Sequence, residues 1–248
     1  VGVLPLIFVR SRLFGSRIVS LPFCEYGGAL LKDSSGRSVL GDALKRVCGL
    51  AGRLKMGYVE LRHPSDGSVS SFLLGVGFGV LCRYLTFRMD LSEGESELWR
   101  RMDKHTRNSL RKAMRGDVEV RDVDAGSLGQ YYSLYLDTVR RLGSPPHSYA
   151  FFKNVFDAFV PEGRLRMVLA LYQGRPIAGV MVFCFNKRLC WWSSVLDRRY
   201  AGLNPTNLLL WRVVCWGLEN GFEVFDLGRT RTEDVGVYRF KRGWGGRE

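Results

Sequence analysis

The last third of the chain constrains the fold most strongly, because short apolar runs alternate there with two-residue turns. Gln173-Gly174 and Asn186-Lys187 each separate runs rich in β-branched and aromatic residues, and this pattern is typical of tight hairpins. A loop over 197–205 follows them. We expect strands over 166–172, 176–185, 188–195 and 223–227 and a helix over 206–220. Antiparallel strands joined to a helix and a further strand predict an α+β unit.

Length and composition leave room for a second domain. The chain has 248 residues, of which 46% are hydrophobic and 25% charged, so it is neither disordered nor fibrous. We expect strands over 1–9, 18–23, 58–62 and 80–90 and a helix over 38–56. From residue 93 the sequence becomes highly charged. We therefore expect a first domain over 1–92 and a second over 93–248.

The net charge of +13 favours an anionic partner. It divides into +6 over residues 1–90, zero over 91–163 and +7 over 164–248. RNA, a nucleotide-bearing cofactor and an acidic membrane surface all fit such a field. An Arg-rich helix expected over 100–115 is either a contact for a polyanion or a solvated helix face.

Several classes of site are excluded. The six cysteines lie singly among apolar residues and the three histidines are dispersed, so we expect reduced thiols, a cytosolic protein and no metal site. No nucleophile elbow, phosphate-binding Walker loop or dinucleotide fingerprint is present. The apolar stretch 69–82 is too short to span a membrane. The chain begins at Val1 within an apolar strand pattern, from which we expect missing N-terminal sequence.

The loop over 197–205 is the first candidate binding site, because it joins a strand end to a helix start. Backbone N–H groups at a helix start bind phosphate, and a glycine lets the backbone approach closely. Thr206 would cap the helix. The loop resembles the pyrophosphate-binding loop of GNAT acyltransferases, Arg/Gln-x-x-Gly-x-Gly/Ala, with Arg199 and Gly202 matching and Asn204 replacing the last small residue. A basic turn that only caps a helix is the alternative.

A wider resemblance rests on the order of motifs along the whole chain. In sequence they are Leu21-Pro-Phe, Tyr26-Gly-Gly28, Tyr58-Val-Glu-Leu-Arg62, Arg107-x-x-Leu-Arg-Lys112, Arg141-Leu-Gly-Ser-Pro-Pro146, Asp226-Leu-Gly228 and Phe240-Lys-x-x-Trp-Gly245. Together they resemble the FemAB/FemX peptidyltransferases of the GNAT superfamily. The match is strongest to a FemAB-like branch associated with exopolysaccharide or exosortase systems.

The resemblance implies an α+β fold with tandem GNAT-like domains, whose mixed sheets are flanked by helices. The first domain is expected to be incomplete, and the family's last strand would lie beyond Glu248. It also implies transfer of an aminoacyl or acyl group from aminoacyl-tRNA or acyl-CoA to an amine on a cell-wall or polysaccharide precursor. No permanent cofactor is expected. Asn204 favours aminoacyl-tRNA over acetyl-CoA as the donor.

The resemblance and the chemistry of acyl transfer point to three catalytic candidates. Lys241 matches the family's Phe-Lys motif and would stabilise an oxyanion or a phosphate. Asp226 and Glu60, at strand ends, would help to deprotonate the amine. Capping or ion pairing is the alternative for both, and Glu60 could pair with Arg62.

Nine further residues are binding candidates. For the donor they are Arg199, Gly202, Asn204 and Thr206, and for the substrate they are Arg229, Tyr238, Phe240, Arg107 and Arg111.

Two other functions stay open at this point. The chain could be a non-catalytic RNA- or polyanion-binding module, or an inactive, truncated member of the family. We expect no DNA partner. We expect a cytoplasmic protein, and a peripheral contact with the inner face of the membrane remains open.

Overall fold

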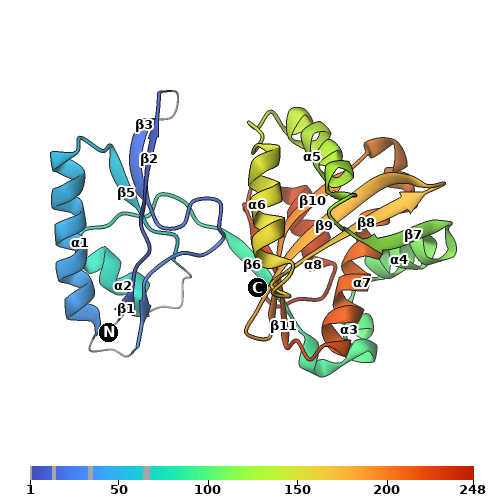
Figure 1. The fold of residues 1–248 in the computed structure, drawn as a ribbon. Helices are drawn as coiled ribbons and strands as arrows, with labels where there is room; N and C mark the ends of the chain where they lie inside the picture. The colour runs from blue at the N-terminus through green and yellow to red at the C-terminus, as the bar shows by residue number, and fades with distance from the viewer. Residues whose placement is uncertain (1, 13–14, 33–35, 64–67) are drawn as a thin grey trace. The chain divides into compact units, whose positions relative to one another are not determined.

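The computed structural model describes residues 2–12, 15–32, 36–63 and 68–248 (Figure 1). The expectation that sequence is missing before Val1 concerns a residue that lies outside these ranges. The chain divides into two compact units, Val1–Arg83 and Tyr84–Glu248. None of the described helices is long and apolar enough to cross a membrane.

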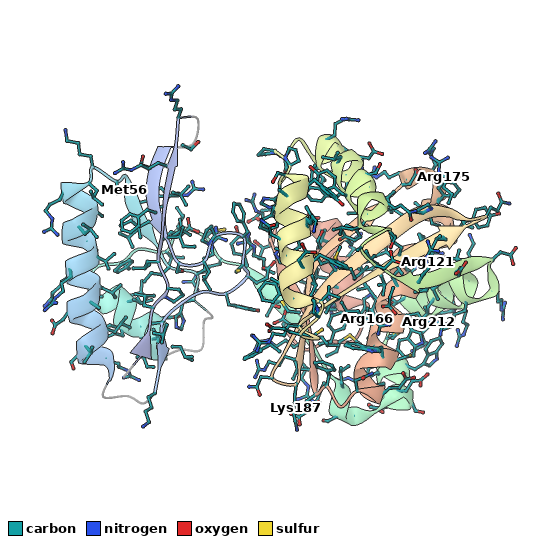
Figure 2. All side chains as sticks on the ribbon, in the orientation of Figure 1. Met56, Arg121, Arg166, Arg175, Lys187 and Arg212 are labelled. Atoms are coloured by element: carbon teal, nitrogen blue, oxygen red, sulfur yellow. The ribbon has the colours of Figure 1, made fainter. Side chains whose placement is uncertain are left out.

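The first unit is a small α/β layer. Its elements are β1 (Gly2–Val3), β2 (Ile7–Ser11), β3 (Gly15–Val19), β4 (Leu30–Leu31), α1 (Gly36–Arg53), β5 (Tyr58–Glu60) and α2 (Ser68–Gly75). β3 pairs antiparallel with β2 and parallel with β5, and α1 forms the crossover between β3 and β5. Met56, labelled in Figure 2, packs with Ile18 and Ala51 beneath this helix, so the apolar stripe of α1 is covered by the sheet.

The second unit is built on a six-stranded sheet in the order β6-β11-β10-β9-β8-β7. Its strands are β6 (Leu85–Asp90), β7 (Val118–Asp122), β8 (Leu165–Tyr172), β9 (Arg175–Phe185), β10 (Arg188–Leu196) and β11 (Val224–Thr230). Its helices are η1 (Leu91–Glu93), α3 (Glu95–Arg101), α4 (Lys104–Arg115), α5 (Leu128–Leu142), α6 (Tyr149–Phe159), η2 (Arg198–Leu203), α7 (Pro205–Glu219) and α8 (Val235–Arg242). All neighbouring strands are antiparallel except β10 and β11.

Helices cover both faces of this sheet. One core joins α3, α4 and α7 to the sheet, with Leu110 and Leu209 fully buried, and the other joins α5 and α6 to the opposite face (Figure 1). Strands buried on both faces read as continuous apolar runs, as β8 and β9 do. Arg166 of β8, labelled in Figure 2, bonds Asp122 of β7 and lies over the ring of Trp216, which ties the edge strand to α7.

The hairpin turns have the backbone that their residues predict. Gln173-Gly174 and Asn186-Lys187 all have positive φ, between 45° and 73°. Two successive left-handed residues form the turn whose twist matches antiparallel strands. The mixed sheets flanked by helices confirm the expected α+β class.

Two expectations differ from the structure at the start of the second unit. We placed residues 80–90 in the first domain, but β6 pairs with β11 and therefore belongs to the second unit. The single Arg-rich helix expected over 100–115 is two helices, α3 and α4. The chain breaks between them at Met102, and the Asp103 side chain accepts a hydrogen bond from the Thr106 N–H at 2.6 Å to start α4.

Candidate functional site

The centre of the second sheet splits open between its two parallel strands. β10 and β11 pair only from Arg188 to Cys190 and from Val224 to Asp226. Beyond that point β10 pairs only with β9, and β11 only with β6, within the described second unit. A bulge displaces Trp192 from the β9–β10 register just beyond the start of the split, and such bulges redirect side chains near functional sites. We call this opening the strand split.

Asp226 marks the start of the strand split and is 8% exposed. Its carboxylate accepts hydrogen bonds from the Thr86 hydroxyl at 2.7 Å, the Gly228 N–H at 2.8 Å and the Arg88 Nε at 3.2 Å. Buried carboxylates are stable when such donors replace water. The bonds from Thr86 and Arg88 join β6 to β11, and the bond from Gly228 holds the turn of the β11 backbone there, where φ is +72°.

Lys241 lies beside the same stretch of β11. Its Nζ, on α8, donates hydrogen bonds to the carbonyl oxygens of Gly228 at 3.0 Å and Arg229 at 2.9 Å. It also lies 5.4 Å from the centroid of the Trp191 ring, the first residue of β10 beyond the paired region. Carbonyl dipoles and an aromatic face both favour a cation, so a buried positive charge is held at the strand split.

The substrate-binding candidates near α8 also gather there. Phe240 lies 6.1 Å from Trp191 between ring centroids, and the Arg229 guanidinium lies 4.7 Å from the centre of the Tyr84 ring. The Tyr238 hydroxyl donates to Glu248 at 2.6 Å, and this bond raises the pKa of Tyr238. The structure thus brings Asp226, Lys241 and these three residues to one end of β11.

The loop over 197–205, expected to bind the donor and called the donor loop below, is η2 together with the start of α7. Arg199 folds back onto Asp197, with 2.6 Å between Nη2 and Oδ2, and this pairing lowers the pKa of Asp197. Gly202 is exposed, and a Cβ there would meet no atom within 4 Å. Asn204 has φ 53° and makes no side-chain cap.

The expected cap at Thr206 is wrong. Pro205 is already the first helical residue, so Thr206 lies inside α7 and cannot occupy the capping position. The structure records no acceptor for the N–H groups of Thr206 and Asn207 in the described second unit. These N–H groups, at a helix start, are suited to hold an anion.

Three other candidates are engaged elsewhere. Glu60 belongs to the first unit and pairs with Arg62 at 2.8 Å, which is the ion-pair alternative considered above. Arg107 donates from Nη1 to backbone carbonyls at the α3–α4 junction. Arg111 bonds Asn108 and lies 5.4 Å from the Trp99 ring centre. Both arginines therefore tie α4 to the preceding helix α3.

Sequence reasoning missed the groups that position Asp226. Thr86 and Arg88 lie about 140 residues before it, on a strand that we placed in the other domain. The only local signal is the alternation of Thr86, Arg88 and Asp90 along β6, which places them on one face. Trp191, which packs against the core of this sheet and contacts Lys241, was not among the sequence candidates. No cluster of three or more metal-ligating side chains occurs among the residues described.

Comparisons with known proteins bear on the family and the fold. The family described as "Acetyltransferase (GNAT) domain" matches residues 100–242. Among solved structures, FemX is similar with a TM-score of 0.69 and 15% identity, over 98% of this chain and 81% of FemX.

Two further solved structures share the fold. The C-terminal domain of a putative enzyme from Agrobacterium fabrum has a TM-score of 0.59 and 12% identity, over 98% of this chain and 77% of that domain. L-PGS from Bacillus licheniformis has a TM-score of 0.56 and 11% identity, over 93% and 66%. A comparison with curated protein sequences gives no match.

Proposed function

Because the chain belongs to the acetyltransferase (GNAT) domain family and has a FemX-like fold, we propose that it is an acyltransferase that acts on a cell-envelope amine. The donor is an aminoacyl-tRNA or an acyl-CoA. The acceptor is the amino group of a cell-wall or polysaccharide precursor. The observation that supports this proposal most directly is the buried Lys241 ammonium at the strand split.

The reaction begins when a neutral amine attacks the carbonyl carbon of the donor. A C–N bond forms, and negative charge develops on the carbonyl oxygen. The C–O bond of the tRNA ester, or the C–S bond of the thioester, then breaks. The proton lost by the amine ends on the departing oxygen or sulfur. The barrier falls when charge on the carbonyl oxygen is stabilised by a group already in place.

In this proposal Lys241 supplies that stabilisation. Two carbonyl hydrogen bonds and the Trp191 ring fix its position before the donor arrives. A preorganised charge in a site shielded from water acts more strongly than one in solvent. Asp226 is already held by three donors, so we propose that it positions β11 and does not itself accept the amine proton.

The remaining candidates take parts in binding. Phe240 and Arg229 border the strand split and contact the acceptor, with Tyr238 beside them. The N–H groups at the start of α7, together with Gly202, hold a donor phosphate. Since Arg62 already neutralises Glu60, Glu60 has no catalytic part in this proposal.

An exposed apolar loop supports a contact with a membrane surface. Leu74, Val80 and Leu81 expose 52%, 54% and 78% of their surface in the first unit, and the stretch 74–82 carries no charge. The exposed Arg83 follows this stretch, and apolar side chains next to basic residues bind anionic lipid surfaces. Replacing Val80 and Leu81 by Ser should lower cosedimentation with vesicles of anionic phospholipid, and unchanged cosedimentation would remove this part of the proposal.

Substitution of Lys241 tests the transferase proposal. Lys241→Met keeps the length of the stem but removes the charge, and we expect transfer to fall about 100-fold or more. Arg239→Ala is the matched control, because Arg239 is an exposed cation on the same helix and no side-chain bond is recorded for it among the described residues. Thermal unfolding of both variants checks that they fold. Full activity in folded Lys241→Met would contradict the role of Lys241.

The donor is identified by following two labels. Protein is incubated with tRNA charged with a mixture of radiolabelled amino acids, or with radiolabelled acyl-CoA, and an amine-bearing envelope precursor. Transfer from one pool names the donor. If wild-type protein moves neither label while binding both donors, the acyltransferase proposal fails.

A further inference from the structure

A hollow lies between the end of α4 and η2, next to the residues that start α7. It has a volume of about 470 Å³ and is lined by Asn108, Lys112, Arg115 and Gly116 at the end of α4 and by Leu203 of η2. We call it the α4–α7 pocket. Leu203 directly precedes Asn204, so the pocket adjoins the donor loop.

Two basic residues of the Arg-rich segment line the pocket without forming ion pairs in the described second unit. Lys112 and Arg115 are exposed, and the structure records no ion pair or side-chain hydrogen bond for either within the described second unit. Elsewhere in the segment, Arg100 and Arg101 pair with glutamates, and Arg107 bonds backbone carbonyls. The polyanion contact expected over 100–115 is therefore best supported at Lys112 and Arg115.

The charges lining the pocket favour an anion. None of its five lining residues is acidic; the exposed Asp117 follows Gly116 in the sequence. Lys112 and Arg115 are three residues apart on α4, so their side chains lie on one face and repel each other. A phosphate between them relieves that repulsion and gains two charge-assisted bonds.

The position of the pocket indicates an extended ligand. The strand split lies between β10 and β11, whereas α7 packs over β8 and β9 and α4 packs against α7. A donor that occupies both places must pass the start of α7. A polynucleotide chain carries phosphates along such a path at regular intervals, so it can contact the pocket while its acylated end enters the strand split.

We propose that the α4–α7 pocket binds backbone phosphates of an RNA donor through Lys112 and Arg115. This inference rests on the proposed acyltransferase function and names the chemistry of its donor. Phosphate contacts of this kind position an RNA without reading its sequence. Coenzyme A, which carries fewer phosphates, is bound at the start of α7 without the pocket.

The test measures binding of an uncharged RNA hairpin with a single-stranded CCA end and a 5′ fluorescein label. Fluorescence anisotropy is followed at 50, 100 and 200 mM salt. The double variant Lys112→Ala/Arg115→Ala should weaken binding and reduce the slope of log K against log salt by about 1 per removed contact, or about 2 in all. The control Lys104→Ala/Arg121→Ala removes the same charge from exposed positions outside the pocket lining and should leave the slope nearly unchanged.

Three results would overturn the inference. The first is an unchanged salt slope in the pocket variant, and the second is an equal change of slope in the control variant. The third is a pocket variant that loses coenzyme A binding, measured by calorimetry, but keeps RNA binding. The hairpin assay needs no chemistry, so it is independent of transfer. If the pocket variant loses RNA binding as expected while wild-type protein transfers nothing, the pocket inference stands and the acyltransferase proposal fails.

Discussion

Gly245→Ala is expected to be among the most destabilising alanine substitutions in the second unit. Gly245 has φ +75°, and a Cβ there would lie 2.6 Å from the carbonyl oxygen and 2.7 Å from the carbonyl carbon of Arg101. These are backbone atoms at the end of α3, where Leu98 of the helix and Met102, which follows it, are buried in the core. The clash therefore cannot be relieved by rotating a side chain.

The expected loss of stability has two parts, and substitutions at two other glycines allow each part to be measured separately. A non-glycine residue in the left-handed region costs about 1–2 kcal/mol, and overpacking of a fixed site costs about 1–3 kcal/mol. We expect Gly245→Ala to lose about 2–5 kcal/mol. Gly143 has φ +67° with no atom within 4 Å, so Gly143→Ala should lose only the first part. Gly202 has neither constraint, and Gly202→Ala should change stability by less than about 0.5 kcal/mol.

Urea unfolding followed by tryptophan fluorescence measures all three variants. All six tryptophans lie at or beyond residue 99, so the signal reports the second unit alone. We expect the midpoints to fall in the order Gly202→Ala, Gly143→Ala, Gly245→Ala, with equal m-values. Equal midpoints for the Gly143 and Gly245 variants would refute the argument from the Arg101 backbone.

Three further outcomes are expected. Arg107→Ala should lower the free energy of unfolding by about 2–3 kcal/mol while leaving the salt slope of RNA binding unchanged, because its guanidinium bonds backbone carbonyls. Burial raises the pKa of Cys184 to about 11, so iodoacetamide at pH 8 should label the exposed Cys82 and reach Cys184 only after unfolding, as mass spectrometry can show. Burial lowers the pKa of His147 in the folded protein. As the pH falls below about 6.5, His147 therefore becomes protonated in the unfolded state before it does in the folded state, and the free energy of unfolding decreases. This fall in urea midpoint between pH 7.5 and 5.5 should be smaller in His147→Gln.

Some of the candidate site could be predicted because its signals are local. The Gly228 turn follows Asp226 by two residues, and the Phe240-Lys241 pair is a contiguous motif, so both were selected as candidates. The donor loop was placed correctly between a strand and a helix. The cap predicted at Thr206 was wrong, because Pro205, with its fixed φ, starts the helix one residue earlier.

The charged residues of α3 and α4 show where pattern alone fails. A run of basic residues at helical spacing looks uniform in the sequence. The break at Met102 turns Arg107 back onto the α3 carbonyls, and the acids of the preceding turns neutralise Arg100 and Arg101. Lys112 and Arg115 have no such partner among the described residues, and both line a pocket. Their distinction from the others depends on partners that only the packed helices reveal.

The sequence by itself determined the local structure of this protein: the positive-φ hairpin turns, the long helices and the apolar runs of the central strands. These depend on backbone preferences and periodicity within a few residues. The tertiary structure alone decided that Thr86 and Arg88 hold Asp226, that Lys241 lies against β11 and Trp191, and that β10 and β11 separate after three residue pairs. Those contacts join residues distant along the chain, and burial makes them specific because a buried charge is stable only where partners meet it.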